Sequence, residues 1–129
     1  MNAAVESIEP WHGNEVVVYA QSKNGEGQGK VLFNGLIEGH EICVGDFAGD
    51  GRDAIVIADR AGNQAANPHL FFPIDDSGSE WRHEIIDPGG MSASGCAVAD
   101  LNGDGRLDFV MIGSSTANIK WYENLGSKR

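Results

Sequence analysis

Three observations on the sequence predict an all-β fold built from repeated four-stranded units. Glycine is about twice as frequent as usual, at 18 of 129 residues with 4 prolines, which favours tight turns between short strands over a helical bundle. The tetrad GDGR occurs from Gly49 and again from Gly103, 54 residues later. Four antiparallel strands per unit of this length are typical of a β-propeller blade, whereas a β-sandwich would not repeat one loop at a fixed period.

The repeat extends well beyond the tetrad. The segment HEICVGDFAGDGRDAIVIADR aligns with SGCAVADLNGDGRLDFVMIGS, and Asp46 matches Asp100. With further matches on both sides, the unit is present about two and a half times. We therefore predict one partial propeller with an incomplete first blade at 1–35, a complete blade at 36–88 and an incomplete last blade at 89–129.

The complete blade contains four segments rich in Val, Ile and Phe, each bounded by Gly, Asn, Asp or Pro, which is the signature of strands joined by hairpins. The first blade would hold the second to fourth strands of the unit, and the last blade the first to third. The strands expected in the complete blade are Ile42–Asp46, Ala54–Ala58, Leu70–Ile74 and Arg82–Ile86.

The charge distribution excludes some partners. The formal net charge is −10, and the 9 Lys and Arg residues do not cluster, so we expect no nucleic-acid partner and no anionic membrane surface. The apolar runs have strand length and are far shorter than the ~18 residues of a membrane span. An acidic chain of this kind favours divalent cations.

The second GDGR loop, DLNGDGRLD, has the oxygen spacing of a calcium site. Asp100, Asn102, Asp104 and Asp108 occupy positions 1, 3, 5 and 9, and Arg106 at position 7 offers its backbone carbonyl. Alternate residues of a tight loop point inward, and calcium takes six to eight such oxygens. The three carboxylates would repel one another without a cation. The alternative is a solvated acidic hairpin that binds no metal.

The first GDGR loop is a weaker metal candidate. Ala48 and Ala54 stand at positions 3 and 9, which leaves the carboxylates of Asp46 and Asp50 and the carbonyl of Arg52. Two carboxylates with carbonyls rarely hold calcium tightly, so we expect weak binding or none there.

The loops at the other end of the blades contain the candidate ligand-binding residues. His40 and Ser94 begin the first strands of their blades and would therefore line the central channel. A polar channel mouth with histidines and a tryptophan suits a sugar or a transition metal. The candidates for this site are Trp11, His12, His40, Arg60 and Ser94.

The two cysteines are predicted to be free thiols. Cys43 lies three residues before Asp46, and Cys96 lies four before Asp100. They would therefore face opposite sides of their strands in different blades, where the Cα separation of a disulfide, within about 7 Å, is not expected.

The segments DLNGDGRLDFV and GDFAGDGRDAIV resemble the FG-GAP/VCBS repeats of integrin-like β-propellers over essentially the whole chain. The resemblance implies calcium as a structural staple and a binding or scaffold function toward carbohydrate or protein ligands. It also implies an extracellular or periplasmic location. The first 30 residues contain no apolar stretch of signal-peptide length, so the chain is expected to be a mature form, a recombinant product or a cytoplasmic protein.

A second resemblance concerns the combination IEPWHGN…EGHE, which is similar to the propeller portion of aldos-2-ulose dehydratase-type sugar lyases. It implies Glu9, His12 and His40 as candidates for a zinc or acid–base site that abstracts a sugar proton. Those lyases need much more chain, so we expect no enzymatic activity. A third alternative is an engineered, self-assembling propeller fragment without a native ligand.

Two and a half blades cannot close a ring. The chain would expose an unpaired blade edge near Ala3–Ile8 and another near Ile119–Asn124. Exposed edge strands pair with other strands, and head-to-tail contacts close by rotation. We therefore expect a closed homo-oligomer, a dimer or a trimer.

Overall fold

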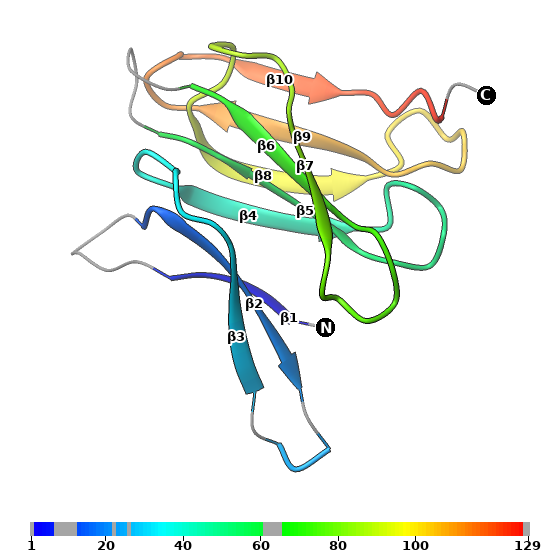
Figure 1. Ribbon diagram of the computed structural model, residues 1–129. Helices are drawn as coiled ribbons and strands as arrows, with labels where there is room; N and C mark the ends of the chain where they lie inside the picture. The colour runs from blue at the N-terminus through cyan, green and yellow to red at the C-terminus, as the bar shows by residue number, and fades with distance from the viewer. Residues whose placement is uncertain (1, 7–12, 22, 26, 61–65, 128–129) are drawn as a thin grey trace.

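A computed structural model describes residues 2–6, 13–21, 23–25, 27–60 and 66–127 (Figure 1). The described residues form three antiparallel sheets, with strand orders β1-β2-β3, β4-β5-β6-β7 and β8-β9-β10, and they include no helix that could cross a membrane. This confirms the predicted all-β, propeller-like architecture. The strands are β1 (Asn2–Glu6), β2 (Glu15–Gln21), β3 (Gly27–Phe33), β4 (His40–Gly45), β5 (Ala54–Ala58), β6 (Pro68–Pro73), β7 (Trp81–Ile85), β8 (Ala93–Ala99), β9 (Asp108–Gly113) and β10 (Ile119–Tyr122).

The four-stranded sheet closely follows the strands expected for the complete blade. β5 has the predicted bounds, and the other three strands begin and end one or two residues earlier than predicted. The first strand ends before Asp46 because the carboxylate of Asp46 accepts hydrogen bonds from the amides of Asp50 and Gly51. Asp46 therefore belongs to the loop, and the ladder stops at Gly45.

The four-stranded sheet lies between the other two, and β5 packs against both of them. Ile55 and Ile57 lie in a cluster with Val16 and Val18 of the first sheet. Val56 and Ala58 lie in the cluster shared with the third sheet. Side chains alternate between the faces of a strand, so a strand covered on both faces must be apolar throughout. This explains the uninterrupted run AIVIA, all of which is buried.

Cys43 of β4 and Cys96 of β8 form a disulfide, with a Cα–Cα distance of 6.0 Å. The prediction of free thiols was therefore wrong. The two cysteines do occupy opposite faces of their own sheets, as their spacing from the aspartates implies. When blades stack, however, opposite faces of successive sheets meet, so Cys43 and Cys96 share the core between the second and third sheets. The disulfide joins the first strands of both sheets.

Candidate functional site

The second GDGR loop, residues 100–108, folds around the carboxylate of Asp100. Its Oδ1 accepts hydrogen bonds from the amides of Gly103 (2.7 Å) and Asp104 (3.1 Å), and its Oδ2 accepts one from Gly105 (2.9 Å). These bonds satisfy amides that a tight turn would otherwise leave to solvent. The glycines at positions 4 and 6 of the loop both have positive φ, 75° and 85°, which only glycine adopts at little cost.

An arginine ties each GDGR loop to the end of the third strand of its sheet. Arg106 makes an ion pair of 2.6 Å with Asp104, and its Nε donates to the carbonyl of Asn124 at 2.8 Å. The first loop repeats this arrangement with Arg52, Asp50 and the carbonyl of Ile74. Sequence reasoning used only the backbone carbonyls of these arginines, although the recurrence of GDGR was a signal for a side-chain role.

Asp108, the last oxygen-bearing position of the second loop, is fully buried. Its Oδ1 accepts a hydrogen bond from the amide of Asn124 (2.8 Å), and its Oδ2 accepts one from Leu101 (3.1 Å). The amide of Asn124, more than any other contact, holds the pKa of Asp108 below its ordinary value, although desolvation opposes the shift. In the first loop Ala54 stands at this position. The first loop therefore lacks a carboxylate that could accept these hydrogen bonds.

The residues of the second loop fit a hard cation in donor chemistry. Among the described residues, no three His, Cys, Asp or Glu side chains are grouped to hold a metal. A calcium site would therefore have to combine carboxylates with the amide oxygen of Asn102 and the carbonyl of Arg106. The loop wound around Asp100 is compatible with this mixed set. The guanidinium of Arg106 competes for Asp104 and already relieves part of the repulsion between the carboxylates.

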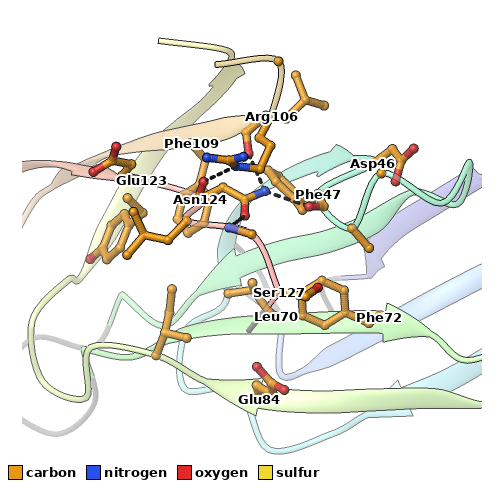
Figure 2. Close-up of a pocket in the computed structure, with 18 of the residues that line it drawn as sticks. Asp46, Phe47, Leu70, Phe72, Glu84, Arg106, Phe109, Glu123, Asn124 and Ser127 are labelled. Atoms are coloured by element: carbon orange, nitrogen blue, oxygen red, sulfur yellow. Dashed lines mark hydrogen bonds between the residues drawn. The ribbon is translucent and has the colours of Figure 1, made fainter. Parts of the chain in front are cut away.

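A cleft of about 1030 Å³ opens between the second and third sheets, next to both loops (Figure 2). One wall is formed by β6, β7 and the residue after β7, and it includes Leu70, Phe72 and Glu84. The opposite wall is formed by β9, β10 and the residues that follow β10. The lining residues are Asp46, Phe47, Ala48, Gly49, Leu70, Phe72, Arg82, Glu84, Ile86, Gly105, Arg106, Leu107, Phe109, Trp121, Tyr122, Glu123, Asn124, Leu125, Gly126 and Ser127.

The cleft combines aromatic surfaces with charged groups. The guanidinium of Arg82 lies 4.7 Å from the centre of the Phe72 ring, and Arg82 also pairs with Glu84 at 3.0 Å. On the other wall Phe109 stacks on Tyr122 with ring centres 4.7 Å apart. Such a surface offers rings for stacking and charged groups for hydrogen bonds.

The structure places the other predicted residues only in part. His40 and Ser94 are half-buried in β4 and β8, at the end of the sheets away from the GDGR loops. Arg60 follows β5, and its carbonyl accepts a hydrogen bond from Ser92 Oγ at 2.8 Å. Three further candidates lie outside the described residues: Glu9, Trp11 and His12.

A buried chain of titratable side chains was missed by sequence reasoning. His69 Nε2 lies 3.0 Å from Asp59 Oδ2, and His69 Nδ1 lies 2.9 Å from His83 Nε2. The three residues belong to different strands or strand ends, so no local spacing pattern connects them. The only indication of this chain in the sequence was that polar residues lie next to uninterrupted apolar runs.

The stacked antiparallel sheets and their two matching GDGR loops define a propeller-type repeat module. A comparison with protein families matches the FG-GAP-like repeat over residues 46–111, just over half of the chain. The chain therefore belongs to the FG-GAP-like repeat family. No curated protein and no solved structure gives a significant match.

Proposed function

We propose that the chain is a binding or scaffold module whose ligand site is the cleft between the second and third sheets. The observation that carries this proposal is the cleft itself, which places the rings of Phe72 and Tyr122 among charged groups. Large concave sites with a few polar groups are the usual location of ligands. Aromatic faces next to carboxylate and amide oxygens suit a carbohydrate, which stacks its C–H face and donates its hydroxyls.

Replacing Phe72 and Tyr122 together by alanine is expected to abolish glycan binding, because it removes two rings that line the cleft and leaves the GDGR loops intact. The measurement is a glycan array followed by calorimetry on the best glycan. Val31→Ala is the control, since Val31 is an apolar residue exposed on β3, away from the cleft. Glycan binding that survives the double substitution would place the site elsewhere. Binding of proteins alone would assign the cleft to a protein ligand.

We also propose calcium as the structural staple of the second loop. Asp100, Asn102, Asp104 and Asp108 would hold it together with the carbonyl of Arg106. When bound, the cation would neutralise the loop carboxylates, and its affinity would add to the free energy of unfolding because the unfolded chain has no such loop.

The proposal includes an oxidising location, extracellular or periplasmic. The Cys43–Cys96 disulfide supports it, since disulfides persist there and are rare in reducing compartments.

Self-association into a closed dimer or trimer remains part of the proposal. Ile112, Ile119 and Trp121 are 49%, 70% and 50% exposed on one face of the third sheet. The positions that match Ile119 and Trp121 in the second sheet, Pro68 and Leu70, are buried against the next sheet. An apolar sheet face of this kind favours association.

Sedimentation velocity at micromolar concentration is expected to show a dimer or trimer of the 13.7 kDa chain. Ile119→Lys should shift the distribution toward monomer, because it buries a charge in the contact. A homogeneous monomer in the unsubstituted protein would contradict the proposed association.

A further inference from the structure

Asp59, His69 and His83 form a continuous hydrogen-bonded chain that runs from the core to the surface. The side chains of Asp59 and His69 are each only 3% exposed, whereas His83 on β7 is exposed. The links measure 3.0 Å between Asp59 and His69 and 2.9 Å between His69 and His83. Solvent therefore reaches one end of the chain, and a buried carboxylate occupies the other.

Hydrogen-bonding rules assign the protons of this chain. The Asp59 carboxylate only accepts, so Nε2 of His69 carries a hydrogen and donates to it. In neutral His69 the other nitrogen, Nδ1, is then an acceptor, and it takes the hydrogen on Nε2 of His83. Nδ1 of His83 is left without a hydrogen. The hydrogen bond to the buried Asp59 carboxylate therefore fixes one tautomer of each neutral imidazole.

The buried carboxylate of Asp59 is held ionised by hydrogen bonds and favours a positive charge nearby. Asp59 accepts hydrogen bonds from the amide of Ile37 (2.9 Å) and the side chain of Asn67 (3.2 Å) as well as from His69. Burial opposes ionisation of Asp59, but the hydrogen bonds, led by that from His69, outweigh it and keep the pKa below the ordinary value. In the described part of the chain, the only ion pair of Asp59 is with His69. A proton taken up by the histidine pair would therefore serve as its counter-charge.

One end of the chain contacts the first sheet, and the other contacts the connection that follows it. Asp59 holds the amide of Ile37, in the connection between the first and second sheets. The ring of His83 lies parallel to Phe71, with centres 4.4 Å apart, and 4.7 Å from the ring of Phe33 at the end of β3. A change in the charge of the two histidines therefore acts directly on the contact between the first and second sheets, which we call the joint.

We propose that Asp59, His69 and His83 form a proton relay that makes the joint between the first and second sheets sensitive to acid. A proton from solvent binds Nδ1 of His83, and the hydrogen on Nε2 of His83 passes to Nδ1 of His69. The positive charge then sits on His69 beside Asp59, and every hydrogen bond of the chain persists. A second proton leaves two cationic rings whose facing nitrogens lie 2.9 Å apart with no acceptor between them, and this link breaks.

The other charged groups around the relay come from each neighbouring element. On β3, Lys30 faces the start of β7 and donates to the carbonyl of Ser79. The inter-sheet connection carries Glu38, and Arg60 follows Asp59 in sequence. On β7 the flanking Arg82 and Glu84 pair with each other. His83 has a lowered pKa because burial and the charge of His69 both oppose its protonation.

The direct test is imidazole nitrogen NMR of the intact chain across a pH titration. At pH 8 the relay requires a hydrogen on Nε2 of both His69 and His83, and on Nδ1 of neither. On acidification the two rings should titrate as a coupled pair that binds its first proton well before its second. A hydrogen on Nδ1 of His69 at pH 8, or two independent single-site titrations, would overturn the relay.

Two variants test the coupling to the joint. Because His83 has a lowered pKa in the fold, the unfolded chain binds more protons below about pH 6.5, and the free energy of unfolding falls as the pH drops from there. His83→Phe keeps the stack on Phe71 and should flatten the fall between about pH 6.5 and 5, whereas an unchanged fall would overturn the coupling. Asp59→Asn should lower the midpoint of the first protonation, and an unchanged midpoint would remove Asp59 from the relay.

Discussion

Replacing Cys43 and Cys96 together by serine is expected to lower the free energy of unfolding by about 4 kcal/mol. The disulfide closes a loop over a sequence separation of 53 residues and so restricts the unfolded chain. It also fastens the first strands of the second and third sheets, whose apolar side chains share one core. Urea denaturation followed by tryptophan fluorescence measures the loss.

Reduction of the unsubstituted protein should reproduce the effect of the double substitution, because both break the same bond. The variant with alanine at both cysteine positions is the control, because the serine variant also places hydroxyl groups in the core. Cys43 is only 8% exposed. Thiol titration of the unfolded, unreduced protein should detect no free thiol. Two free thiols per chain, or equal unfolding midpoints with and without reductant, would contradict the disulfide.

Removing calcium with EGTA is expected to lower the melting temperature, with a loss of about 2.7 kcal/mol if calcium is first present at a hundred times its dissociation constant. The reason is that the carboxylates of Asp100 and Asp104 then lose their cation. Asp104→Ala should melt at the same temperature with and without EGTA. Differential scanning calorimetry gives both values.

The first loop provides the matched control. Asp50→Ala removes the equivalent carboxylate from the loop that lacks oxygen side chains at positions 3 and 9, so its melt should keep the full EGTA effect. Identical melts of the unsubstituted protein with calcium and with EGTA would contradict the calcium site. The second loop would then be held by its amides, by the Arg106–Asp104 pair and by the hydrogen bond from Arg106 to Asn124.

The sequence alone determined the features that depend on neighbours along the chain. The GDGR spacing placed the turns, since a turn needs glycine and aspartate at particular positions within a few residues. The apolar run of Ala54–Ala58 placed β5, and its lack of polar positions marked a strand covered on both faces. Family membership followed from the same repeated loop.

Only the tertiary structure decided what lies between the sheets. Cys43 and Cys96 were judged by the faces of their own strands, but the stacking of the sheets turns those opposite faces toward each other. The contact of His69 with Asp59 likewise joins separate strand ends, and the cleft forms where the walls of two sheets diverge. Turn chemistry and strand alternation are local properties of a sequence. Contacts between sheets depend on how whole sheets pack, and no spacing within one repeat encodes that.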